Sequence, residues 1–300
     1  MKTSKIVLGL VFGLALTSQT NAQGLLDGFT PKKGNLSVTA SYTSSNYEKF
    51  YAGKTKMDAV PDHNKIDQNI YSIYAKYGIT NKLSVVLNAP YISAEGNGDV
   101  APNINSKQDG FQDISIGLKY NAYTFDFEKL NLDVITGLSV DIPTGYEANG
   151  ILSLGNNTFS TNLTAGLHLQ SNDGLFVTFL NSYQFKGDAD NTSGGADFDV
   201  PNAYYATTKI GYASSAIYVE GWVDYLASTD GVDIGGTGFA GPNGPNFPET
   251  KVEYTRLGAT VYKNIIPELG ASVGFGTVVD GRNIGKSTNF SVGLTYNLNI

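Results

Sequence analysis

Hydrophobic and polar residues alternate one by one along much of this sequence, and the alternation is clearest at the end. In residues 289–300, Phe290, Val292 and Leu294 alternate with Ser291 and Gly293, and the pattern continues to the last residue. Successive residues of a β-strand point to opposite faces. This segment is therefore expected to be a strand with one wholly apolar face and one face of small polar residues.

The same alternation recurs along the chain and predicts about twelve strands. We expect them at residues 35–46, 66–79, 83–92, 112–123, 131–142, 158–170, 175–185, 201–212, 216–226, 250–263, 269–279 and 288–300. The faces are hardest to assign in 201–212 and 250–263, where a bulge could shift the alternation. No linker interrupts the series, so residues 35–300 are expected to form one all-β domain.

The segments between these strands are alternately short and long. Short turns such as 80–82 and 171–174 would lie at one end of the structure, and long polar loops such as 93–111 and 227–249 at the other. This is the pattern of a transmembrane antiparallel β-barrel with short periplasmic turns and long extracellular loops. A soluble barrel fills its interior with apolar side chains, which works at about eight strands but not at twelve. A secreted β-sandwich or β-solenoid is the remaining alternative.

Aromatic residues near both ends of the predicted strands support the membrane barrel. Such residues are selected at the two interfaces of a bilayer. Tyr77, Tyr120, Tyr123, Tyr212 and Tyr262 fall near the turns, and Tyr91, Tyr183, Phe185, Tyr225 and Phe290 fall near the loops. Tyr262 is the doubtful member, because its position in the alternation is compatible with an inward side chain.

The N-terminus has the pattern of a targeting segment. Lys2 and Lys5 precede the apolar run 6–16, which is shorter than the roughly 20 residues that a membrane helix needs. Small and polar residues follow, up to Ala22. We therefore expect residues 1–22 to be a signal peptide that is cleaved near Ala22, and the mature chain to reach the outer membrane of a diderm bacterium. Residues 23–34 would then be either a lumen plug or a disordered lead-in.

Composition excludes several classes of function. The formal net charge is -7 and there is no cysteine. A basic face for nucleic acid is therefore not expected, and disulfides and thiolate metal sites are excluded. We expect no cofactor and no metal. The acidic loop 186–200 could bind calcium through its carboxylates, but we favour a solvated acidic loop.

Charged residues on the inward face are the candidates for a constriction in the lumen. They are Lys76, Lys119, Asp133, Lys209, Glu220, Asp224 and Arg256. A symmetric turn at 213–216 would place Lys209 directly across from Glu220, and Lys119 would lie diagonal to Asp133. We favour ion pairing along the lumen wall over a constriction that selects solutes by charge.

Two carboxylates and three aromatic residues complete the candidate lumen. Asp113 and Asp141 are expected to be near neighbours close to the loops. Two solvated rim carboxylates are favoured there over a pair that raises one pKa or recruits a cation. Tyr74, Tyr205 and Trp222 could line an apolar path through the barrel.

Several segments resemble the outer-membrane family labelled as the meta-pathway of phenol degradation type. They are residues 77–83 (YGITNKL) with 89–91 (APY), 110–120 (GFQDISIGLKY) and 141–145 (DIPTG). The rest of the chain matches this family only in the rhythm of its strands. The resemblance implies transport of small, often aromatic, compounds across the outer membrane. It implies no catalytic residues.

We therefore expect an outer-membrane channel or transporter for passive passage of small, hydrophobic or aromatic compounds, and not an enzyme. The alternatives are a barrel enzyme that acts on lipid and a structural or adhesive surface barrel. The expected partners are outer-membrane lipid and lipopolysaccharide, small-molecule solutes, and the barrel-assembly machinery, which would read the C-terminal strand. Nucleic acid is not among them.

Overall fold

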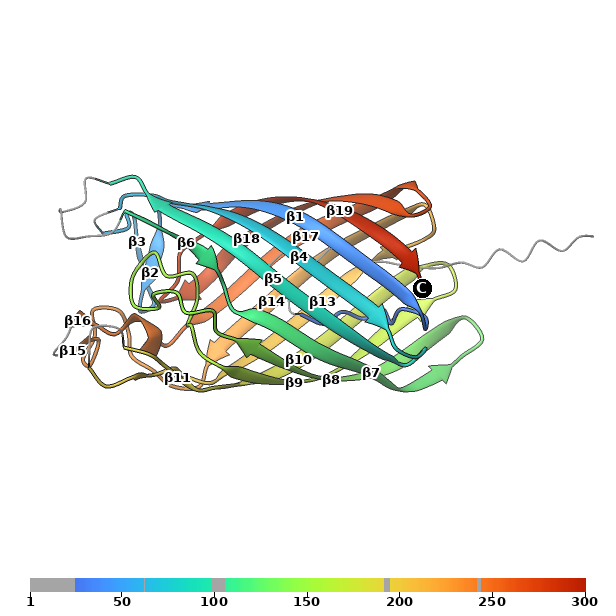
Figure 1. The fold of residues 1–300 in the computed structure, drawn as a ribbon, viewed down its shortest axis with the longest axis horizontal. Coiled ribbons are helices and arrows are strands. Elements are labelled where there is room, and N and C mark those ends of the chain that lie inside the picture. Colours follow the sequence, from blue (N-terminus) through green and yellow to red (C-terminus); the bar gives the residue numbers. More distant parts are fainter. Residues whose placement is uncertain (1–24, 62, 99–105, 192–194, 242–243) are drawn as a thin grey trace, which may run out of the picture.

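The computed structural model describes residues 25–61, 63–98, 106–191, 195–241 and 244–300. The predicted signal peptide, 1–22, lies outside these residues. Long antiparallel strands form one cylinder, and each strand pairs with its neighbours in the chain (Figure 1). Among the described residues, no helix is long and apolar enough to cross a membrane.

Twelve strands close the cylinder. The main sheet has thirteen strands, of which β6 (Lys107–Phe111) only extends the loop end of one neighbour. The other twelve are β1 (Asn35–Tyr47), β4 (Ile66–Gly78), β5 (Leu83–Gly96), β7 (Ile114–Asp126), β8 (Leu130–Ile142), β9 (Ser160–Ser171), β10 (Leu175–Lys186), β13 (Ala203–Ala213), β14 (Ile217–Ser228), β17 (Glu253–Ile266), β18 (Leu269–Arg282) and β19 (Thr288–Asn299). The first and last of them, β1 and β19, pair along their length and close the ring. The predicted all-β barrel of about twelve strands is confirmed.

Short elements lie in the long loops at one end of the cylinder (Figure 1). They are β2 (Phe50–Ala52), β3 (Thr55–Met57), β11 (Asp188–Ala189), β12 (Phe198–Asp199), β15 (Ala240–Gly241), β16 (Gly244–Pro245) and the 3₁₀ turn η1 (Phe247–Glu249). The opposite end carries the tight turns. The predicted asymmetry between turns and loops is therefore present.

The outer surface of the barrel is apolar and its inner wall is polar. In β19, Val292 and Leu294 are 53% and 54% exposed, whereas Ser291 before them and Thr295 after them are buried. A soluble barrel would show the opposite arrangement. An apolar outer band around a polar interior is the arrangement that a lipid bilayer requires of a barrel.

Local irregularities lie near the ambiguous positions of the sequence. The register between β17 and β18 shifts twice: Val279 of β18 is the extra residue opposite Thr255 and Arg256, and Ile265 of β17 is the extra residue near the turn. The bulges therefore lie beside and just after the segment 250–263, and not within it. No shift occurs along β13. Tyr262 points inward and is 2% exposed, so it does not belong to the outer aromatic band.

Candidate functional site

The described N-terminal segment, residues 25–34, runs inside the cylinder from the end with the tight turns (Figure 1). The end of the segment that leads into β1 is fixed to the barrel, because the Gly34 amide donates to the carbonyl of Gly78 at 2.8 Å. Further in, the Phe29 ring packs edge-on against Phe176, with ring centroids 5.1 Å apart, and also contacts His168. The segment therefore occupies part of the lumen cross-section.

Asp27 of this segment is the shared counter-ion of two lysines of the lumen wall. Its carboxylate lies 2.9 Å from Lys76 Nζ on β4 and 3.2 Å from Lys119 Nζ on β7. All three side chains are at most 3% exposed. Burial alone would raise the pKa of Asp27, but the two ammonium groups hold this pKa well below its usual range. The segment is thus joined to the wall by a buried ionic network.

Asp27 is a buried residue of the lumen that the alternation of polar and apolar residues does not reveal. It lies before the first strand, in a segment without periodicity. A usable signal does exist in the sequence: Lys76 and Lys119 point inward, and the lead-in contains a single acidic residue. Two buried ammonium groups need a counter-ion, and the chain immediately before the barrel can supply one.

Lys209 does not lie across from Glu220 as predicted. Lys209 pairs with Trp222, and Glu220 pairs with Gly211. The Ser214 hydroxyl accepts hydrogen bonds from the next amides of the turn, which centres the turn one residue further along the chain and moves the register by two. Lys209 still reaches Glu220 diagonally, with Nζ 3.7 Å from the carboxylate.

Lys119 is not diagonal to Asp133 either. Lys119 pairs with Gly137, four residues from Asp133 along β8. Asp133 instead accepts a hydrogen bond of 2.5 Å from the Thr124 hydroxyl.

Arg256 forms a second ionic cluster nearer to the loops. Its guanidinium donates to Asp224 at 2.9 Å, and Asp224 is fully buried. The guanidinium carbon lies 5.7 Å from the ring centroid of Trp222 and 5.2 Å from that of Tyr254. Trp222 thus packs against a cation in the lumen, and its indole is not a free apolar surface.

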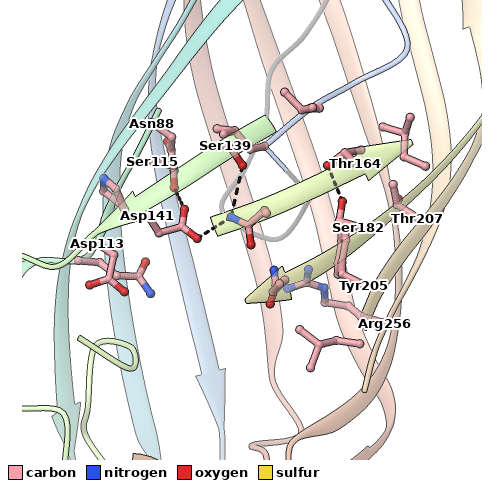
Figure 2. Close-up of a pocket in the computed structure, with 18 of the residues that line it drawn as sticks. Asn88, Asp113, Ser115, Ser139, Asp141, Thr164, Ser182, Tyr205, Thr207 and Arg256 are labelled. Atoms are coloured by element: carbon pink, nitrogen blue, oxygen red, sulfur yellow. Dashed lines mark hydrogen bonds between the residues drawn. The ribbon is translucent and has the colours of Figure 1, made fainter. Parts of the chain in front are cut away.

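A cavity of about 300 Å³ lies between the N-terminal segment and the loops (Figure 2). Leu25 and Leu26 line it from the segment. The wall residues that Figure 2 labels are Asn88, Asp113, Ser115, Ser139, Asp141, Thr164, Ser182, Tyr205, Thr207 and Arg256. Of the predicted lumen residues, this cavity brings together Asp113, Asp141, Tyr205 and Arg256. Tyr74 lies elsewhere, against the segment, where its hydroxyl donates to the Leu25 carbonyl at 3.3 Å.

The two carboxylates of the cavity are held differently. Asp141 accepts hydrogen bonds from the Ser115 hydroxyl at 2.6 Å and from the Asn162 amide at 2.8 Å. Asp113 lies just before β7. Burial raises the pKa of Asp113 to about 7, and the charge of Asp141 adds to this shift, while a hydrogen bond from Tyr146 opposes it. The cavity therefore contains one carboxyl group that titrates near neutral pH.

Among the described residues, no group of three or more His, Asp or Glu side chains is arranged to hold a metal ion. Residues 192–194 of the acidic loop 186–200 lie outside that part of the chain.

Comparison with known proteins places this barrel in a family. The model of the family described as "Putative MetA-pathway of phenol degradation" matches residues 65–294, which is most of the chain. The chain belongs to this family. The family resemblance that the sequence motifs predicted is thereby confirmed, and the match extends well beyond those motifs.

Solved structures share the fold at low sequence identity. An outer membrane channel from Pseudomonas putida F1 is 16% identical, with a TM-score of 0.72, and the alignment covers 90% of this chain and 97% of that one. The NanC porin is 11% identical over 88% of this chain and all of its own, with a TM-score of 0.48. The CymD monoaromatic hydrocarbon channel is 12% identical over 90% of this chain and 89% of its own, with a TM-score of 0.42. A comparison with curated protein sequences finds no match. The family and the fold identify the chain as an outer-membrane β-barrel.

Proposed function

We propose that this protein is a channel for the passive passage of small solutes through the outer membrane. The observation that carries this proposal is the closed ring of twelve strands with an apolar outside, a polar inside and a cavity in its lumen. The P. putida protein of the same fold is described as an outer membrane channel. The family description, together with the leucines and tyrosines of the cavity, favours solutes with an aromatic or other apolar part.

The N-terminal segment is the plug of this channel in our proposal. Leu25 and Leu26 project toward the wall, where a Cβ atom added to Gly137 would lie 2.2 Å from a methyl group of Leu26. Together with the Asp27 network and the packing of Phe29, these contacts support a docked segment rather than a disordered lead-in. Passage of solutes would then require the segment to move or to leave a narrow path beside it.

The route to the membrane is part of the same proposal. Residues 1–22 would direct export and be removed near Ala22. The exposed apolar face of β19, which ends the barrel, would be read by the assembly machinery, and the apolar outer band would contact lipid and lipopolysaccharide.

An enzyme that acts on lipid is less well supported. A Ser–His pair of that kind would need its histidine near the lipid face. His168 lies inside the lumen at 2% exposure, and its Nδ1 atom hydrogen-bonds to the Thr178 hydroxyl at 2.7 Å. His63, the other histidine, is also buried. An adhesive surface barrel would not need a lumen cavity.

Uptake measurements test the proposed function. Cells that lack the gene and cells in which it is restored are compared for entry of a panel of small aromatic and sugar solutes. We expect restoration to increase uptake of at least one small aromatic class. Equal uptake of every solute, combined with an electrically silent protein in planar bilayers, would contradict the proposal.

A further inference from the structure

The lumen cavity has groups of opposite charge on its opposite walls. Asp141 lies on β8 and Asp113 directly before β7, whereas Arg256 lies on β17. In the order of strands around the ring, β17 is six places from β7 and five from β8, out of twelve. Strands half a ring apart face each other across the lumen, and Figure 2 shows Asp113 and Asp141 on one side of the cavity and Arg256 on the other.

The acidic wall has hydrogen-bond acceptors without partners. Asn162 is 7% exposed and lines the cavity, and its amide nitrogen donates to Asp141 and Ser139. Its Oδ1 atom has no hydrogen-bond partner, and neither does Oδ1 of Asp113. Buried polar atoms are normally paired, so two unpaired acceptors beside a carboxylate indicate a place for a bound donor. An ammonium group, which has three donors and a positive charge, fits this wall.

The opposite wall offers a donor. Arg256 uses one terminal nitrogen for Asp224, while its buried Nε atom has no hydrogen-bond partner. A guanidinium group has five donors in a planar fork, so a second carboxylate can bind beside Asp224. The rings of Trp222 and Tyr254 fix the position of the guanidinium.

Apolar side chains lie between the two walls. Leu25 and Leu26 of the N-terminal segment, Leu180 of β10 and Leu226 of β14 line the same cavity. The volume of about 300 Å³ is at the small end of the range for ligand pockets. The site therefore has acceptors on one side, a cationic donor on the other and an apolar surface for a compact hydrocarbon part.

We propose that this cavity binds small zwitterions, with the ammonium group at Asp141, Asp113 and Asn162, and the carboxylate at Arg256. This inference rests on the proposed channel function and specifies the class of solute. A molecule that carries only one of the two charges would leave one wall unpaired. Zwitterions with an aromatic or aliphatic part should consequently occupy the lumen longer than either singly charged analogue.

Three probes of the same hydrocarbon size distinguish the contributions of the two charged groups to binding. Phenylalanine carries both charged groups, phenethylamine only the ammonium and 3-phenylpropanoate only the carboxylate. Each is titrated into planar bilayers that contain the purified full chain, and the half-blocking concentration of the single-channel current is measured. For the wild-type protein, we expect this concentration to be at least ten-fold lower for phenylalanine than for either analogue.

Two variants test which charged group of the solute binds at each wall of the cavity. Arg256→Gln should remove the advantage of phenylalanine over phenethylamine, whereas Asp141→Asn should remove its advantage over 3-phenylpropanoate. Arg256→Gln leaves buried Asp224 without its guanidinium partner, so the double variant Asp224→Asn/Arg256→Gln is measured as well and should give the same result. Asp173→Asn, in an exposed turn at the other end of the barrel, is the control and should behave as wild type.

The outcomes distinguish the two proposals. Discrete current steps with equal block by all three probes would overturn the zwitterion site but leave the channel intact. Loss of block by all three probes in both variants would also overturn the assignment of the two walls. Absence of current steps from folded protein, checked by circular dichroism, would overturn the channel itself.

Discussion

Asp27 combines an unusual degree of burial with two cationic partners. It comes from a segment without regular secondary structure, yet its carboxylate bridges Lys76 and Lys119 on two different strands. Removal of one partner from a buried ionic cluster leaves the remaining charges without compensation. The segment and the wall are therefore expected to be energetically coupled through this ionic cluster.

Asp27→Asn is predicted to destabilise the barrel. The substitution leaves two buried ammonium groups without a carboxylate, and the loss of one partner from a buried ion pair costs about 3–5 kcal/mol. Urea unfolding in detergent, with the exposed Asp173→Asn as control, measures the free energy of unfolding. An Asp27→Asn value equal to wild type would show that the network does not hold the segment.

Asp113 is predicted to make the lumen pH-sensitive. Because burial raises the pKa of Asp113 to about 7, its carboxyl is charged above that pH and neutral below it. The charged groups that face it are Asp141 and Lys186, with the Tyr146 hydroxyl also in contact. The cation-over-anion permeability ratio should therefore fall as the pH is lowered from 8 to 6. The reversal potential measures this ratio, and Asp113→Asn should show a flat ratio over that range; a wild-type ratio equally flat would contradict the assignment.

At the scale of secondary-structure elements, the sequence predicts the positions and faces of the strands but not their register. Alternation predicts where each strand lies and which face is apolar, because both follow from local geometry, and β19 follows the predicted alternation from Phe290 to Tyr296. Register depends on how each turn closes. The hydroxyl of Ser214, which sets the β13–β14 pairing, gives no periodic signal.

The outward face of β19 is predicted to be intolerant of charge. Leu294 is 54% exposed on the lipid side, and an arginine near the middle of a bilayer costs roughly 2–4 kcal/mol there. Leu294→Arg should reduce the amount of folded barrel that reaches the membrane, whereas Asn299→Arg, at the end of the strand, should be tolerated. Fractionation of membranes measures both variants. Normal delivery of Leu294→Arg would mean that this face does not contact lipid.

At the scale of the whole molecule, the barrel is a polar passage within an apolar cylinder, partly filled by its own N-terminal segment. The barrel could be predicted because a twelve-strand ring is too wide to pack dry. For the N-terminal segment, the alternation leaves the choice between a lumen plug and a disordered lead-in open, because its placement depends on contacts between residues far apart in the sequence, such as Leu26 with Gly137. The same holds for the site of opposed charges, where the order of strands around the ring brings Asp141 and Arg256 to one cavity.

A cysteine pair at Leu26 and Gly137 can fix the segment in place, since the chain has no cysteine of its own. A Cβ atom added to Gly137 would lie 3.7 Å from Leu26 Cγ. In the Leu26→Cys variant, the sulfur atom would take about the place of this Cγ atom, which brings it close to the side chain introduced at 137. Introduced together with Asp27→Asn, which weakens the docking, this pair makes the position of the segment depend on one reducible bond.

The decisive measurement is the single-channel conductance of Asp27→Asn/Leu26→Cys/Gly137→Cys in planar bilayers, before and after reduction of the disulfide. The account predicts small discrete steps while the disulfide is intact and larger steps once it is reduced. Steps of equal size in both states would contradict closure by the segment, and the absence of any step in either state would contradict the channel.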